Sequence, residues 1–164
     1  MKIFVITLVI LVSGCASQMN QQEAVSVQLT GVELHLENGF KELSNSNFKK
    51  AITEFNKTIG LCEGQYSNSD KKVYASRGPS ETLYYMMKAA ADGESAIAVG
   101  PACSEALYYK GYASLDLGQV EEAEQYIKKA IDMAPANSAY QSELGHIYHS
   151  KRDWKRALKV FKKA

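Results

Sequence analysis

The chain has 164 residues, of which 46% are hydrophobic and 23% charged, and its formal net charge at pH 7 is +1. This composition is that of an ordinary folded protein and excludes a chain too polar to bury a core. The balanced charge also excludes the strong positive field that attracts nucleic acids, so no nucleic-acid partner is expected. One compact domain or a short array of repeats is predicted at this length.

Residues 1–14 have the pattern of an export signal. Lys2 precedes an apolar run over residues 3–11, and small residues follow it. The run is too short to cross a membrane as a helix, which favours a cleaved signal peptide over a transmembrane helix. The mature protein is therefore predicted to lie in the cell envelope.

The four residues that end at Cys15, VSGC, resemble the lipobox of bacterial lipoproteins. The resemblance implies that Cys15 becomes the acylated first residue and that its lipid chains hold the protein on a membrane. An ordinary signal peptide followed by a cysteine is the alternative. Ala16 is not the aspartate linked to inner-membrane retention, so the resemblance implies the outer membrane, facing the periplasm. Residues 15–31 are predicted to be the lipidated N-terminus and a polar tether.

Helical periodicity begins after the tether. Residues 32–65 are predicted to form a first pair of helices, because apolar residues recur at spacings of three and four in the second half: Phe48, Ala51, Phe55 and Ile59. Residues 70–103 are predicted to be a second, degenerate unit, because Gly78 and Pro79 would break its first helix. A helix from residue 81 to about 92 is expected there, with Tyr84 and Tyr85 divided between core and surface and with this buried face: Leu83, Met86, Met87 and Ala90.

Residues 104–137 show the clearest pattern in the chain. Two amphipathic helices meet at Gly118, and Pro135 ends the unit. Small residues allow close helix packing, and the pattern depends on these positions: Leu107, Gly111, Leu117, Ala123, Tyr126, Ile127 and Ala130. With its 34-residue length, the unit resembles the tetratricopeptide repeat. It departs from that family at Lys110, where an aliphatic residue is usual, and at Ser114, where an aromatic residue is usual.

Residues 138–164 restart the same pattern, and Trp154 is expected to be buried at their turn. The resemblance therefore implies an all-α solenoid over residues 32–164, with about four repeats, since each hairpin must cover the apolar side of its neighbour. Cys62 and Cys103 remain after lipidation. An exported compartment permits a disulfide between them, and two buried thiols are the alternative.

No pattern for catalysis is present, since no nucleophile elbow surrounds Ser80, Ser104 or Cys103 and no glycine-rich phosphate loop occurs. The protein is predicted not to be an enzyme and to need no cofactor. Glu143, His146 and His149 share a helix face at spacings of three, which is a weak pattern for a metal site. A small-molecule or metal-binding envelope protein that uses these histidines and the irregular second repeat is the alternative function.

The family's groove implies a surface that binds a peptide or protein. The groove positions fall on these residues: Tyr108, Tyr112, Leu115, Asp116, Ser142, His146 and His149. Two tyrosines one turn apart suit peptide binding, although they could instead pack against the preceding repeat. They replace the Lys and Asn of the family's carboxylate clamp. The predicted function is that of a membrane-anchored adaptor or assembly factor for a cell-envelope complex.

Overall fold

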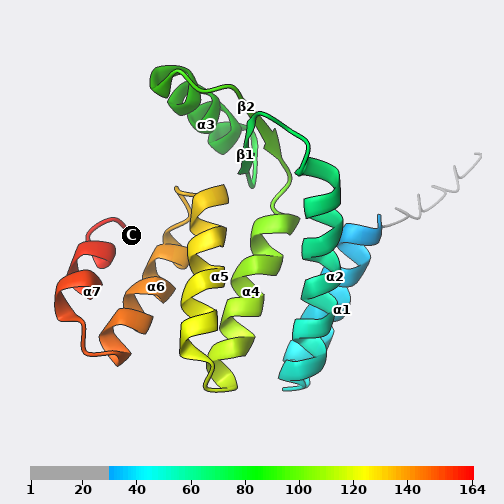
Figure 1. The fold of residues 1–164 in the computed structure, drawn as a ribbon, viewed down its shortest axis with the longest axis vertical. Coiled ribbons are helices and arrows are strands. Elements are labelled where there is room, and N and C mark those ends of the chain that lie inside the picture. Colours follow the sequence, from blue (N-terminus) through cyan, green and yellow to red (C-terminus); the bar gives the residue numbers. More distant parts are fainter. Residues whose placement is uncertain (1–29) are drawn as a thin grey trace, which may run out of the picture.

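The computed structural model describes residues 30–164, which form seven helices and two strands (Figure 1). The elements are, in chain order, α1 (Gly31–Ser44), α2 (Phe48–Tyr66), β1 (Lys72–Ala75), α3 (Pro79–Asp92), β2 (Ala96–Val99), α4 (Ala102–Asp116), α5 (Val120–Met133), α6 (Ser138–Ser150) and α7 (Trp154–Phe161). The predicted signal peptide, the lipidation site Cys15 and the tether up to residue 29 lie outside the described residues. Within residues 30–164, no helix combines the length and apolarity needed to cross a membrane.

Six of the helices form three antiparallel pairs that lie side by side: α1 with α2, α4 with α5, and α6 with α7 (Figure 1). In each pair a glycine of the first helix meets a large side chain of the second, at the same sequence spacing: Gly39 with Phe55, Gly111 with Ile127, and Gly145 with Phe161. A Cβ atom at Gly111 would lie 2.7 Å from Cγ1 of Ile127, too close for any larger residue without a shift. This confirms the predicted stack of helical hairpins, with three pairs in residues 30–164 where about four repeats were expected.

The turn between the two helices of each pair contains one residue with left-handed backbone. Ser46, Gly118 and Arg152 have φ angles of 57°, 75° and 58°. Only glycine adopts this conformation without steric cost. The chain thus uses the favourable residue in the middle pair and a less favourable one in the outer two.

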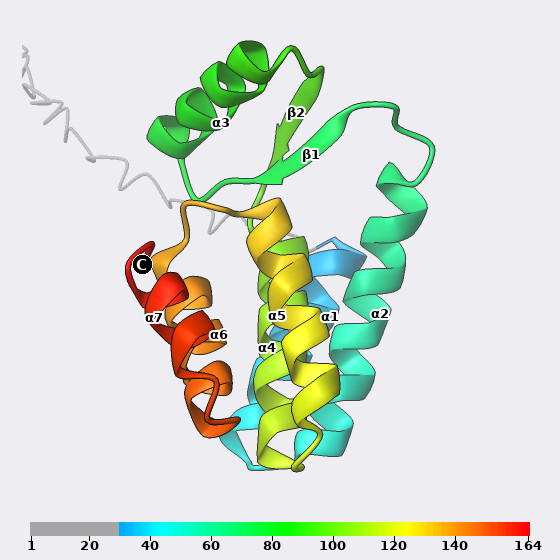
Figure 2. The ribbon, with the colours of Figure 1, turned by 60° about the vertical axis from the view of Figure 1, so that its left-hand side comes forward.

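Residues 70–103 differ from the expected helical repeat. They form β1, α3 and β2, in which the two strands pair in parallel with Lys72 opposite Ala96 (Figure 2). The strand sequences, KVYA and AIAV, contain β-branched and aromatic residues that favour extended structure. The helix expected from residue 81 to about 92 is present as α3, but β2 stands where the rest of a helical repeat was expected. We call residues 67–101 the insertion, because the helices that flank it in the sequence, α2 and α4, pack directly against each other.

The buried side of α3 also differs from the prediction. Tyr85 and Ala89 are buried on the sheet, where the Tyr85 ring stacks on Tyr74 with 4.9 Å between centroids. Leu83 and Met87, which were expected inside, are 62% and 63% exposed. The division between Tyr84 and Tyr85 is confirmed, since Tyr84 is 53% exposed and Tyr85 fully buried. The prediction failed because it assumed a helical neighbour, whereas a sheet covers a different side of α3.

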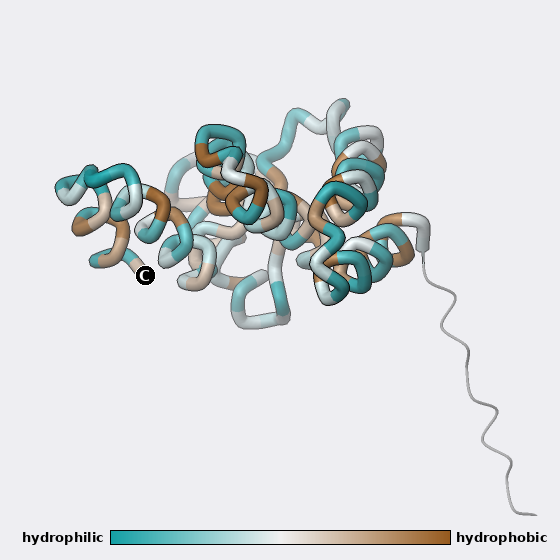
Figure 3. Tube along the Cα trace, turned by 90° about the horizontal axis from the view of Figure 1, so that it is seen from below, coloured by the Kyte–Doolittle hydropathy of each residue, from teal (hydrophilic) through white to brown (hydrophobic). Residues whose placement is uncertain are grey.

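Contacts within and between the helix pairs bury three adjoining apolar clusters, which share Tyr108, Ile131 and Ile59 at their borders. Apolar and polar stretches alternate along the helices, as expected where one side is packed and the other faces solvent (Figure 3). Lys110 is buried beside this core, where its ammonium donates to Oδ1 of Asn56 at 2.7 Å and lies 3.7 Å from the Tyr126 ring centre. Trp154, by contrast, is 57% exposed, so the expectation that it is buried was wrong. Its ring lies against His149 instead.

Candidate functional site

The predicted groove residues lie on α4 and α6, the first helices of the second and third pairs. Most of them face solvent: Tyr112, Asp116, His146 and His149. Tyr108 is half-buried, since its ring stacks on Tyr140 of α6 with 4.6 Å between centroids. Burial raises the pKa of Tyr108 to about 12. Leu115 and Ser142 are also half-buried. Tyr112, which is 42% exposed, is therefore the aromatic residue of α4 most available to a partner.

The residues of the alternative metal or small-molecule site are not brought together. His146 packs edge-on against Phe161, with 5.3 Å between ring centres, and His149 packs against Trp154. The hollow beside Gly78 and Pro79 is lined by residues of 76–86 and 98–100, which include neither histidine. Within residues 30–164, no three His, Cys, Asp or Glu side chains are grouped so that they could hold a metal ion.

A second cleft, of about 670 Å³, lies between α2, β1 and α5 at the end of the stack that carries the insertion. This cleft was not expected from the sequence. α2 continues to Tyr66, beyond Cys62, the residue that joins it to the start of α4, before the chain turns into β1. The volume is in the range of natural ligand sites. The cleft residues are Ile59, Cys62, Glu63, Tyr66, Ser67, Lys71, Lys72, Val73, Cys103, Leu107, Lys128, Lys129, Asp132 and Met133.

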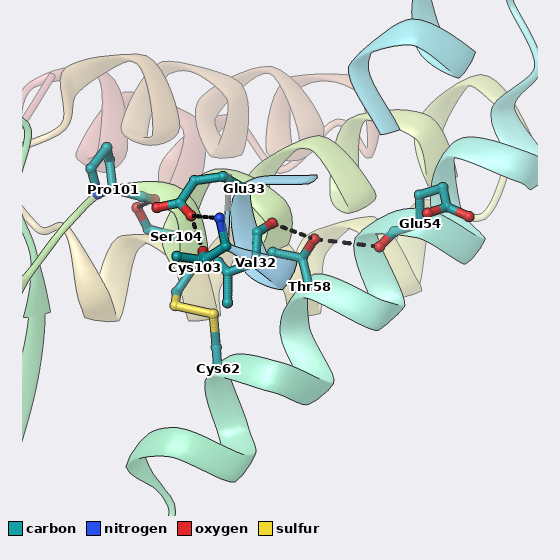
Figure 4. Close-up of a disulfide and its surroundings, with 9 residues drawn as sticks. Val32, Glu33, Glu54, Thr58, Cys62, Pro101, Cys103 and Ser104 are labelled. Atoms are coloured by element: carbon teal, nitrogen blue, oxygen red, sulfur yellow. Dashed lines mark hydrogen bonds between the residues drawn. A yellow bond between two sulfur atoms is a disulfide. The ribbon is translucent and has the colours of Figure 1, made fainter. Parts of the chain in front are cut away.

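A disulfide between Cys62 of α2 and Cys103 of α4 lines this cleft (Figure 4). The Cα atoms of the two cysteines are 6.0 Å apart, and both residues are almost completely buried. The bond encloses the whole insertion, so it ties together the two helices from which the insertion leaves and to which it returns. The sequence left open whether these cysteines form a disulfide or remain two buried thiols, and the structure contains the disulfide.

The cleft has an apolar interior and a mainly basic rim. Ile59, Leu107 and Met133 contribute the apolar surface together with the disulfide. Four lysines and two acids surround them: Lys71, Lys72, Lys128, Lys129, Glu63 and Asp132. Such a combination suits a ligand that has both an apolar group and negative charge.

Two of the four lysines are already paired. The ammonium of Lys72 donates to both carboxylate oxygens of Asp132 at 2.7 Å, and Lys128 donates to Glu124 at 2.5 Å. Neither Lys71 nor Lys129 forms an ion pair with any residue of the described part of the chain, and both are exposed. These two ammonium groups are therefore the ones available to an acidic partner.

Two features of the sequence could have pointed to this cleft. Gly39 and Gly111 occupy equivalent positions in their hairpins. They are 72 residues apart in the sequence, which is not a whole number of 34-residue repeats, so extra chain must leave the stack between them. Two lysine pairs, at residues 71–72 and 128–129, are also visible in the sequence. The sequence does not show that the pairs meet, because this depends on where β1 crosses the end of the stack.

Stacked hairpins with an open cleft and an exposed groove define a helical protein-interaction module. In agreement, residues 87–138 and 115–164 match the family profile described as Tetratricopeptide repeat. The match places the tetratricopeptide pattern within residues 87–164, from the second half of α3 to the end of α7. This family is a scaffold that is generally non-catalytic, and its repeats present surfaces to protein partners.

Comparison with individual proteins gives more distant likenesses. The chain is 30% identical over 110 residues to serine/threonine-protein phosphatase T of Trypanosoma brucei brucei, which covers 63% of this chain and 22% of the phosphatase. It thus spans under a quarter of that relative. Among solved structures, MamA from Desulfovibrio magneticus RS-1 is 22% identical with a TM-score of 0.38, covering 80% of this chain and 72% of that chain. PilF of Pseudomonas aeruginosa is 14% identical with a TM-score of 0.37, covering 81% and 74%.

Proposed function

We propose that the protein is a lipid-anchored adaptor or assembly factor of the cell envelope, which holds a segment of a partner protein and performs no catalysis itself. Three observations support this proposal. The repeats belong to a class that binds proteins. The disulfide suits an oxidising compartment outside the cytoplasm. The lipobox-like residues before Cys15 supply the attachment to the membrane, in the outer membrane facing the periplasm.

The observation on which the proposed binding site depends is the cleft beneath the insertion. Its apolar interior can accept an aliphatic or aromatic side chain, and Lys71 and Lys129 can pair with carboxylates on either side of it. The partner segment is therefore an extended peptide in which an apolar residue is flanked by acidic ones. The groove predicted from the sequence is a second candidate, favoured by the exposure of Tyr112.

Site-specific photo-cross-linking in intact cells tests the proposal. A photoreactive amino acid is placed at Lys129 in the cleft, at Tyr112 in the groove, or at Lys155 on α7 as an exposed control. We expect Lys129 to give a defined adduct whose linked peptide carries an apolar residue next to acidic ones. Adducts at Tyr112 alone would show that the partner binds in the groove and not in the cleft. If no position gives an adduct above the Lys155 control, the adaptor function is contradicted.

The membrane attachment is tested separately. Replacing Cys15→Ser should yield a chain that stays unacylated by mass spectrometry and leaves the membrane fraction. A wild-type chain of unmodified mass at Cys15 would exclude the lipid anchor while leaving the cleft unaffected.

A further inference from the structure

One side of α3 is apolar and covered by nothing in residues 30–164. Leu83, Tyr84 and Met87 are 62%, 53% and 63% exposed, and Ala90 and Ala91 beside them are also exposed. The opposite side of the helix rests on the sheet through Tyr85 and Ala89. A helix that is apolar on both sides is normally covered on both. We call the group Leu83, Tyr84, Met87, Ala90 and Ala91 the α3 face.

The charged residues of this helix are directed away from the α3 face and are already paired. Glu81 accepts hydrogen bonds from the backbone N–H of Arg77 at 2.7 Å and from its Nε at 2.8 Å. Lys88 donates to Asp92 at 2.5 Å. The α3 face therefore offers apolar contact and the hydroxyl of Tyr84, without any charge that would select a complementary protein surface.

The position of the α3 face indicates what covers it. The insertion lies at one end of the helix stack, and the turns after α4 and α6 lie at the other (Figures 1 and 2). The chain enters at the insertion end, since α1 begins beside the disulfide, where the Thr58 hydroxyl donates to the carbonyl of Val32 at 3.4 Å (Figure 4). Gly31 meets Leu61 there as well.

The length of chain before α1 sets how far the lipid anchor can be. Residues 16–30 can span at most about 50 Å, at roughly 3.5 Å for each extended residue. An acylated Cys15 would therefore keep the insertion end within this distance of a bilayer at all times. At such a high effective concentration, even a small apolar surface partitions into the membrane interface, where tyrosine is favoured.

We propose that the α3 face rests in the interface of the membrane that carries the lipid anchor, so that the insertion forms a second attachment point. This inference rests on the proposed lipidation of Cys15. Two attachments fix the orientation of the molecule: the helix stack stands on the membrane by its insertion end, and the cleft opens near the lipid surface. A partner segment bound in the cleft would then lie close to the bilayer.

Tryptophan fluorescence tests the contact directly, because Trp154 is the single tryptophan of the chain and begins α7, at the end far from the insertion. The lipidated full chain is reconstituted in phosphatidylethanolamine and phosphatidylglycerol vesicles with brominated acyl chains. In the double variant Leu83→Trp, Trp154→Phe, we expect a blue-shifted emission that bromine quenches several-fold more strongly than it quenches Trp154 in the wild type. Equal, weak quenching in both proteins on the same vesicles would overturn the proposal.

A second measurement keeps this inference separate from the lipid anchor. In the lipidated chain that carries Leu83→Trp and Trp154→Phe, the added changes Tyr84→Ser and Met87→Ser should reduce the bromine quenching several-fold, although the chain stays anchored at Cys15. The matched control Leu158→Ser removes a leucine of 58% exposure from α7 and should leave the quenching unchanged. Equal quenching of all three chains would overturn the α3 contact even if Cys15 is acylated. A blue shift of the Leu83→Trp emission that appears without vesicles and grows with protein concentration would also overturn it. The α3 face would then be covered by a second copy of the chain.

Discussion

At the scale of single residues, the three turns between paired helices differ in stability. Ser46 and Arg152 adopt the left-handed conformation that Gly118 adopts without cost. We expect Arg152→Gly or Ser46→Gly to raise the free energy of unfolding by about 1 kcal/mol, and Gly118→Ala to lower it by a similar amount. Urea unfolding followed by circular dichroism measures both. As a control, Lys155→Gly inside α7 should destabilise the protein, and stabilisation by glycine at all positions would contradict the argument.

Glu124 gives the clearest dependence of stability on pH. It lies on α5 and accepts hydrogen bonds from Lys128 at 2.5 Å and from Lys151, after α6, at 2.8 Å. Burial acts to raise its carboxyl pKa, but the two lysines outweigh burial and lower the pKa to about 2. Because the folded pKa lies below the ordinary glutamate value of 4.5, this stabilisation is complete above about pH 4.5 and is lost as the pH falls toward 2.

We therefore expect Glu124→Gln to lower the free energy of unfolding by about 1–2 kcal/mol at pH 7, with the partial exposure of both lysines taken into account. The difference from wild type should shrink steadily between pH 4.5 and 2. Glu121→Gln is the control, since the Glu121 side chain is 80% exposed and pairs more loosely with Lys151. A loss that stays constant with pH would show that packing of the side chain, and not its charge, is responsible.

At the scale of elements, Tyr85 attaches the insertion to the repeats. Its ring is fully buried against Tyr74, and its hydroxyl oxygen accepts a hydrogen bond at 3.3 Å from the backbone N–H of Ala136, between α5 and α6. Tyr85→Ala should cost about 3–5 kcal/mol of local stability, whereas Tyr85→Phe, which keeps the ring, should cost about 1 kcal/mol. Hydrogen exchange is the measurement: protection should fall in β1, α3 and β2 and persist in α4 and α5. Uniform loss of protection would contradict a separable insertion.

The sequence predicted the elements that repeat and also α3, where a helix from residue 81 to about 92 was expected, but it missed the two strands. The hairpins could be recognised because Gly39, Gly111 and Gly145 stand at equivalent positions, and a repeated local pattern fixes a repeated local structure. Residues 70–103 occur once, and strands of four residues carry too little periodicity to identify. The buried side of α3 was wrong for the same reason, since a sheet that is not predicted cannot cover Tyr85.

The candidate site shows the same limit. The groove residues could be named from the repeat pattern, and Tyr112 is indeed exposed, but stacking on Tyr140 makes Tyr108 half-buried. That contact joins two repeats and depends on their angle. The cleft depends on three elements, α2, β1 and α5, which are distant in sequence. The four lysines of the cleft can be read from the sequence, but the fact that they surround one cleft cannot.

At the scale of the whole molecule, the disulfide joins the first helix pair to the second and closes the loop that contains the insertion. Fixing a loop of 41 residues restricts the unfolded chain, so replacing both cysteines (Cys62→Ala, Cys103→Ala) should lower the free energy of unfolding by about 4 kcal/mol. Addition of a reductant to the wild type should give a similar loss in urea unfolding. If the reductant lowers the free energy of unfolding of the wild type no more than that of the double variant, the two cysteines are not bonded in the protein.

We propose that the cleft holds an acidic partner segment through Lys71 and Lys129. The most direct test measures the affinity of the partner identified by cross-linking for the double charge reversal Lys71→Glu, Lys129→Glu, with a matched reversal at the far end of α2, Lys49→Glu, Lys50→Glu. We predict that the cleft reversal weakens binding at least tenfold and reduces its dependence on salt, while the control binds like the wild type. Equal affinity of all three proteins would contradict the account.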